Sequence, residues 1–174
     1  MVSVDFQPDV VIGVATGGQH VADAMNFSGD CQRLTVRRQR QVTRVKAAVG
    51  LRRILSVLPT QVNDLLRRME MTARRTVFRL RNHEAESSEV VVIGGSVDSI
   101  LARPVKVLVV DDAVDSGGTL RDVIEFVRSH NAAAEIRSAV IVVTFEQPLV
   151  RPDFALWRQT IVRFPWSSDA RSAI

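Results

Sequence analysis

One stretch of the sequence constrains the fold more than any other. It runs from Val107 to Thr119 and reads V-L-V-V-D-D-A-V-D-S-G-G-T. Its first four residues are aliphatic, as expected for a strand that a parallel sheet buries on both faces. The next two, Asp111 and Asp112, then fall at the carboxyl end of that strand, where open α/β sheets bind their ligands. The stretch therefore predicts a parallel sheet and the position of a ligand site.

A glycine turn and a helix follow this strand. The residues of Asp115–Thr119 are small, so their backbone can approach a ligand closely. Beyond them an apolar stripe at helical spacing predicts an amphipathic helix. The stripe consists of Leu120, Val123, Ile124 and Val127. Because a helix N-terminus attracts anions, the turn is suited to phosphate, while paired carboxylates suit hydroxyl groups or a hydrated cation. A phosphorylated sugar would satisfy both.

The complete D-D-A-V-D-S-G-G-T motif resembles the phosphoribosyl pyrophosphate binding motif of the type I phosphoribosyltransferases. The resemblance implies that Asp111 and Asp112 hold the ribose hydroxyls and a Mg²⁺ cofactor. It also implies that Asp115 lies near the ring nitrogen of the incoming base, so that these three aspartates form the catalytic set. Four residues would bind the 5′-phosphate, namely Ser116, Gly117, Gly118 and Thr119. At Gly118 many members carry a lysine or another residue.

A second glycine turn occurs near the N-terminus, in V-V-I-G-V-A-T-G-G. Phe6–Val14 is typical of a buried strand, and the apolar residues after the turn indicate a short helix. Taken alone, the turn is equally consistent with a tight structural turn and with a second anion site. It also resembles the pyrophosphate loop of the same family. There Thr16 replaces a frequent arginine or lysine, so the amides of Thr16, Gly17 and Gly18 would bind pyrophosphate.

Strand and helix patterns alternate through the rest of the chain. Further strands are expected at 34–36, 90–93 and 136–145. Alternation of this kind predicts an α/β fold in which a mainly parallel central sheet is flanked by helices. A length of 174 residues suits one hydrophobic core, so we expect a single domain over residues 1–174.

Basic residues are concentrated in the middle of the sequence. Between Arg33 and Arg81 there are 14 basic residues and two acidic ones. Apolar stripes on either side of Pro59 predict a basic helical hairpin, inserted at residues 37–81. A solvated outer face would explain the arginines as well as a functional surface would. A homodimer through this hairpin or through a sheet edge is the functional role we favour. Nucleic acid is not expected, because aromatic residues do not alternate with the arginines.

Residues 148–174 resemble the C-terminal hood of the xanthine and guanine phosphoribosyltransferases. The likeness is carried by P-D-F at 152–154 and F-P-W at 164–166. It implies that Phe164 and Trp166 stack on a flat base, although such aromatics could equally close an edge of the core. In that branch a lysine near the preceding strand end contacts the base, whereas this chain has Glu146. We therefore expect Glu146 to contact the base, and hypoxanthine and guanine to be poor substrates.

These observations favour an enzyme that transfers the phosphoribosyl group of phosphoribosyl pyrophosphate to a purine-like base and releases pyrophosphate. The alternative is a non-catalytic relative that binds a sugar phosphate or nucleotide in a regulatory role. The lack of tyrosine in the sequence favours this alternative. A phosphate-binding response module is a weaker third interpretation. No apolar run is long enough to span a membrane, and no signal peptide pattern is present, so a cytoplasmic protein is expected. The sequence does not identify the base, the oligomeric state or the pathway.

Overall fold

The structure is a computed structural model that describes residues 6–27, 29–39, 88–101, 104–160 and 162–167. These residues all belong to one compact unit, which comprises Met1–Arg40 and Glu86–Ser172. The predicted basic hairpin lies outside the described residues, except for its first three positions. The part of the C-terminal segment beyond residue 167 also lies outside them.

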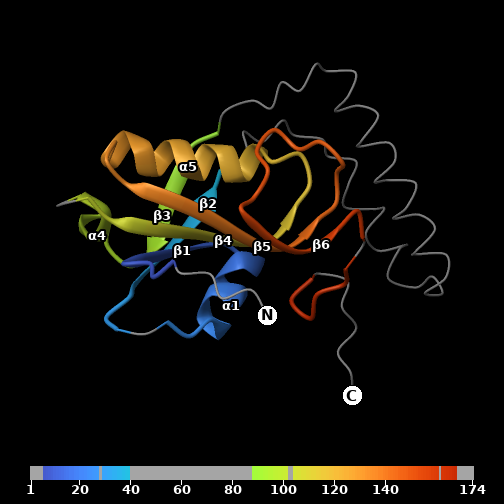
Figure 1. Ribbon diagram of the computed structural model, residues 1–174, viewed down its shortest axis with the longest axis horizontal. Coiled ribbons are helices and arrows are strands. Elements are labelled where there is room, and N and C mark those ends of the chain that lie inside the picture. The colour runs from blue at the N-terminus through green and yellow to red at the C-terminus, as the bar shows by residue number, and fades with distance from the viewer. Residues whose placement is uncertain (1–5, 28, 40–87, 102–103, 161, 168–174) are drawn as a thin grey trace. The chain divides into compact units, whose positions relative to one another are not determined.

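A six-stranded sheet forms the centre of this unit (Figure 1). Its strands are β1 (Val10–Val14), β2 (Gln32–Arg38), β3 (Val90–Gly94), β4 (Lys106–Val114), β5 (Glu135–Val143) and β6 (Phe154–Arg158). They are arranged in the order β3-β2-β1-β4-β5-β6. All neighbours are parallel except β2 and β3, which pair antiparallel at one edge. The predicted α/β fold with a mainly parallel sheet is confirmed.

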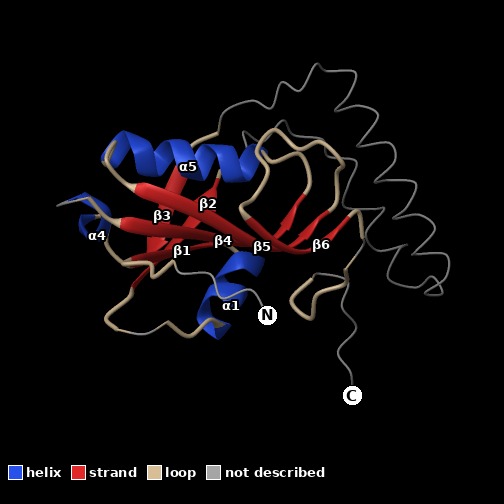
Figure 2. Ribbon diagram, in the orientation of Figure 1, coloured by secondary structure: helices blue, strands red, loops and turns tan. Residues whose placement is uncertain are grey.

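Helices cover both faces of the sheet, as Figure 2 shows for α1 (Gly17–Ala24) and α5 (Gly118–His130). A short helix, α4 (Asp98–Leu101), packs on the same side as α5, because its Ile100 belongs to the core cluster beneath α5. Among the helices in the described part of the chain, none has both the length and the hydropathy needed to cross a bilayer.

The core consists of two layers, one on each side of the sheet. Successive residues of a strand point to opposite faces, so neighbours on β4 belong to different layers. Val109 packs with Leu120 and Val123 of α5, whereas Val110 packs with Ala22 of α1. Because both faces of β4 are covered, every residue of its aliphatic run is buried. Burial on both faces explains why this strand reads as continuously apolar.

Several strands differ from the sequence prediction. β1 begins at Val10 and not at Phe6, and β4 continues through Asp111 and Asp112 to Val114. The strand expected at 34–36 extends to Gln32–Arg38, so the first two residues of the predicted insertion belong to β2. Residues Phe154–Arg158 form the edge strand β6, which the sequence analysis had assigned only to the hood. Leu156 and Trp157 are 72% and 51% exposed on this strand, so its sequence lacks a burial pattern.

Asp153 fixes the start of β6. Its Oδ2 accepts hydrogen bonds from the Ser138 backbone N at 2.8 Å and from Ser138 Oγ at 2.7 Å. Burial works against the charged form, but the hydrogen bonds from Ser138 and Arg137 outweigh it and lower the pKa of Asp153. The carboxylate therefore joins β5 to the segment that enters β6.

The burial of β1 yields a stability prediction that uses two isoleucines. Ile12 is 0% exposed on β1, whereas Ile93 is 45% exposed on β3. We expect Ile12→Ala to lower the free energy of unfolding by about 2–5 kcal/mol, because it leaves a cavity in the core. Ile93→Ala should cost less than about 1 kcal/mol. Equal losses in urea unfolding curves would contradict the assignment of Ile12 to the core.

Candidate active site

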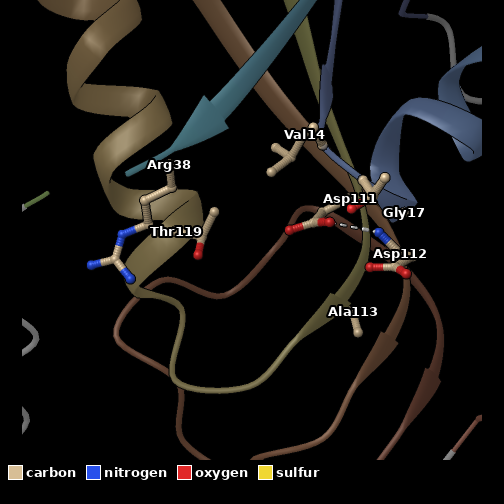
Figure 3. Close-up of a pocket in the computed structure, with 9 residues that line it drawn as sticks. Val14, Gly17, Arg38, Asp111, Asp112, Ala113 and Thr119 are labelled. Carbon is tan, nitrogen blue, oxygen red and sulfur yellow. Dashed lines mark hydrogen bonds between the residues drawn. The ribbon is translucent and has the colours of Figure 1, made fainter. Parts of the chain in front are cut away.

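A polar cavity of about 310 Å³ lies at the carboxyl ends of β1, β2 and β4 (Figure 3). Three strand ends and the first turn of α5 contribute its walls. The lining residues are Val14, Ala15, Thr16, Gly17, Arg38, Asp111, Asp112, Ala113 and Thr119. Five of the predicted site residues are thus brought together, namely Thr16, Gly17, Asp111, Asp112 and Thr119. The cavity therefore joins members of both glycine turns to the acidic pair.

The two aspartates at the end of β4 have different surroundings. Asp111 Oδ1 accepts a hydrogen bond from the backbone N of Asp112 at 2.9 Å. Burial raises the pKa of Asp111 well above its usual value, and the neighbouring Asp112 and Asp115 carboxylates raise it further. A cation in the cavity would offset this repulsion and favour the ionised form. Asp112 Oδ2 accepts a hydrogen bond from Trp166 Nε1 at 2.7 Å.

The glycines of the first turn are part of helix α1. Gly17 and Gly18 are its first two residues, and both are buried against the end of β4. A Cβ atom on Gly17 would lie 1.8 Å from Asp112 Oδ2, and one on Gly18 would lie 2.4 Å from the Val110 carbonyl oxygen. The peptide bond between Ala15 and Thr16 is cis. Glycine is thus needed here because α1 and β4 pack closely, a reason that the sequence analysis did not give.

The second turn is braced from the opposite side by the segment after β5. Gly117 has a φ of +81°, and the backbone N of Leu149 donates to the Ser116 carbonyl oxygen at 2.8 Å. Asp115 accepts a hydrogen bond from the Thr144 hydroxyl. Ser116, Gly117 and Gly118 immediately precede Thr119 in the sequence. Of these four residues, only Thr119 lines the cavity. The sequence analysis missed Thr144, which stands one residue beyond β5.

Arg38 is the functional candidate that the sequence analysis missed. It is the last residue of β2, it lines the cavity, and its Nε donates to Asp122 Oδ2 at 2.6 Å. In Figure 3 it lies beside Thr119, across from the two aspartates. The period of a strand could have found it, because Leu34 and Val36 face the core under α5 and Arg38 continues that series. Its place among many other arginines concealed it.

The predicted base-binding residues lie in different places. The Trp166 ring lies 5.1 Å from the His20 ring and 5.2 Å from the Phe164 ring, with which it is stacked. Phe164 is buried, and Trp166 reaches Asp112 from the side of α1. Glu146 is exposed and is not among the residues that line the cavity. The structure thus places Trp166 in contact with the acidic pair, with Phe164 stacked on it. Glu146 does not form part of the cavity wall.

Asp111 and Asp112 match the way in which proteins hold magnesium. Mg²⁺ usually takes one or two carboxylates and completes its shell with substrate phosphates and water. Within the described ranges, no three His, Cys, Asp or Glu side chains are grouped as a complete protein site for a metal. The acidic pair could supply the one or two carboxylates that such a shell takes from a protein.

The parallel sheet, the paired aspartates and the S-G-G-T turn at the start of α5 are the features that the resemblance to the type I phosphoribosyltransferases leads us to expect. The family described as phosphoribosyl transferase domain matches residues 59–167, well over half of the sequence. The chain belongs to this family. The match begins at Pro59 and so includes the second half of the predicted hairpin, which the sequence analysis treated as an insertion.

Solved structures agree with this fold. A purine phosphoribosyltransferase from Pyrococcus horikoshii has a TM-score of 0.51 and 22% identity, over 92% of this chain and 78% of that chain. A xanthine-guanine-hypoxanthine phosphoribosyltransferase from Helicobacter pylori has a TM-score of 0.46 and 13% identity, over 87% of this chain and 68% of that chain. The first likeness concerns the fold alone, and the second carries no further weight. No curated protein sequence matches.

The two glycines of α1 make a matched pair for mutation. In Gly17→Ala the atoms nearest to the new methyl group belong to the Asp112 carboxylate, which can rotate away, so the fold should persist while the Trp166 contact is lost. In Gly18→Ala it meets the backbone of Val110 and Asp111, so we expect a loss of stability of about 1–3 kcal/mol. Thermal unfolding and tryptophan fluorescence would measure both effects. A larger loss of stability for Gly17→Ala would contradict this picture.

The raised pKa of Asp111 predicts a pH dependence of stability. The folded protein keeps a proton that the unfolded chain releases above about pH 4. The contribution of Asp111 to the free energy of unfolding is therefore largest at low pH and is lost as the pH rises through the raised pKa. Relative to Asp111→Asn, the unmodified protein should lose stability over this range in urea unfolding experiments. A difference that stays constant with pH would contradict the assignment.

Proposed function

We propose that the protein is a magnesium-dependent phosphoribosyltransferase that transfers the phosphoribosyl group of phosphoribosyl pyrophosphate to a purine-like base. The observation that carries the proposal is the single cavity that combines Asp111 and Asp112 with Thr119 and Arg38. Carboxylates, amides at a helix N-terminus and a guanidinium are complementary to a sugar with phosphate groups at two ends.

The chain would bind such a substrate through three of its elements. The N-terminus of α5, with Thr119, would receive the 5′-phosphate, and the end of β4 would hold the ribose hydroxyls through the acidic pair. Thr16 and Gly17 line the opposite part of the wall and would contact pyrophosphate through their amides. Magnesium, held by Asp111 and Asp112, would neutralise charge on the phosphates.

The chemistry needs electrostatic stabilisation more than a strong nucleophile. As pyrophosphate leaves the anomeric carbon, positive charge grows on the ribose and negative charge on the leaving group. Asp111 and Asp112 would stabilise the ribose, whereas the amides of Thr16 and Gly17 would stabilise the leaving anion. Asp115, held by the Thr144 hydroxyl, would take the proton of the incoming base nitrogen.

A non-catalytic regulatory role is the second candidate, and one observation favours it. Trp166 donates to Asp112 from the C-terminal segment, so one oxygen of the predicted ribose ligand is already engaged. A binding protein could retain this contact permanently and hold a ligand through the other carboxylate oxygen, since a carboxylate accepts several hydrogen bonds. Binding without pyrophosphate release would identify the regulatory protein.

The decisive experiment is calorimetric titration with phosphoribosyl pyrophosphate and Mg²⁺, followed by a pyrophosphate release assay over a panel of bases. We expect Asp112→Asn to weaken binding about 10-fold or more when magnesium is present, because a charged ligand is lost. The affinity for inorganic phosphate should stay the same. Equal losses for both ligands would contradict the ribose and metal role.

With guanine or hypoxanthine as the accepting base, the protein should release pyrophosphate slowly. The reason is that Glu146 stands after β5, where the resembled enzymes have a lysine. Glu146→Lys should raise the rate with these bases if the side chain faces the base. Efficient turnover of guanine by the unmodified protein would contradict this specificity.

A further inference from the structure

Asp122 is a buried acidic residue that lies outside the cavity. It is on α5, one helical turn after Thr119, and its side chain is 1% exposed. A carboxylate removed from water is strongly destabilising unless cations or hydrogen-bond donors compensate it. The contacts of Asp122 should therefore include groups that compensate its charge.

Two arginines and one backbone amide share this carboxylate. Arg38 Nε donates to Oδ2 at 2.6 Å, and the Ser88 backbone N donates to the same oxygen at 3.1 Å. Arg121 donates to Oδ1 through Nη2 at 2.8 Å and Nε at 3.1 Å. Both oxygens are thus engaged by charge-assisted hydrogen bonds. Only one of the two arginines, Arg38, lines the cavity.

We propose that Asp122 is a positioning residue that fixes the Arg38 guanidinium at the cavity wall for a phosphate group of the substrate. The inference rests on the proposed function, because it assigns a role within the same site. Arginine offers five N–H donors in a rigid plane, and Asp122 engages the one on Nε. The direction of that bond orients the plane of the guanidinium before the ligand arrives.

Arg38 needs such support because it brings positive charge to the cavity through a long and flexible side chain. Thr16 stands where a cation is frequent in the resembled pyrophosphate loop, so that turn supplies amides but no positive charge. Arg38 supplies positive charge from β2 instead, through a long side chain that has many rotamers when nothing holds it. A partner with 1% exposure on a packed helix is a firm support for that side chain.

The competing explanation is that Asp122 only joins β2 to α5. Arg121 provides a matched control, because it also pairs with Asp122 but does not line the cavity. The variants to compare are Arg38→Gln, Asp122→Asn, the double variant, and Arg121→Gln. Each is titrated separately with ribose 5-phosphate and with inorganic pyrophosphate, and its thermal unfolding is recorded.

Arg38→Gln should lower the affinity for at least one of these ligands about 10- to 100-fold, because charge-assisted hydrogen bonds are lost. Asp122→Asn should lower the affinity for the same ligand about 5-fold or more, and the double variant should be no worse than Arg38→Gln. Arg121→Gln should bind within about 2-fold of the unmodified protein, whatever its stability. The ligand that loses affinity identifies the phosphate that Arg38 contacts.

A turnover measurement separates positioning from folding. In folded Asp122→Asn the KM for phosphoribosyl pyrophosphate should rise while the KM for the base stays constant. If Asp122→Asn does not fold, Arg38→Lys replaces it, because lysine keeps the charge but lacks the oriented Nε. Full affinity in folded Asp122→Asn or in Arg38→Lys would overturn the positioning role alone. Failure of the unmodified protein to bind any of the three ligands would instead overturn the proposed function together with it.

Discussion

The close approach of helix α1 to the end of strand β4 is the constraint on which the candidate site depends. β4 is a central strand whose run of residues 107–110 is buried on both faces, and its two carboxylates follow that run. Gly17 and Gly18 leave room for Asp112 and for the backbone of Val110, so α1 can begin directly beside them. A side chain at Gly18 would push the first turn away from the backbone of β4, and one at Gly17 would displace the Asp112 carboxylate. The cavity forms where the start of α1 and the acidic pair of β4 pack directly against each other.

The sequence predicts the fold well wherever burial dominates. β4 and β5 have aliphatic runs that only a strand covered on both faces explains, and the stripe of α5 has a clear helical period. β6 is different, because Leu156 and Trp157 are exposed at the sheet edge and its pairing with β5 comes from chain connectivity. A strand whose side chains remain in solvent leaves little trace in the pattern of apolar residues.

The site was predictable in its two glycine turns and the acidic pair, but not in the partners that reach it from β2 and from the C-terminal segment. Asp111, Asp112 and Thr119 come from one continuous motif, so their convergence follows from a strand, a turn and a helix. Arg38 joins them from a strand 73 positions before Asp111, and the contact depends on sheet order, which a single sequence does not specify. Likewise, the Trp166 contact with Asp112 required the path of the C-terminal segment. The family resemblance located the motif but not these long-range partners.

Asp122 also marks where the chain leaves and re-enters the sheet. Arg38 lies just before residues 40–87 and Ser88 lies just after them, and both bind the same carboxylate oxygen. The backbone N of Gln39 donates to the Glu89 carbonyl oxygen at 2.8 Å, which closes the gap further. With the ends already side by side, doubling the number of residues between them adds only about 0.6 kcal/mol of closure entropy. The number of residues between Gln39 and Ser88 can therefore change at little entropic cost while β2 and β3 keep their pairing.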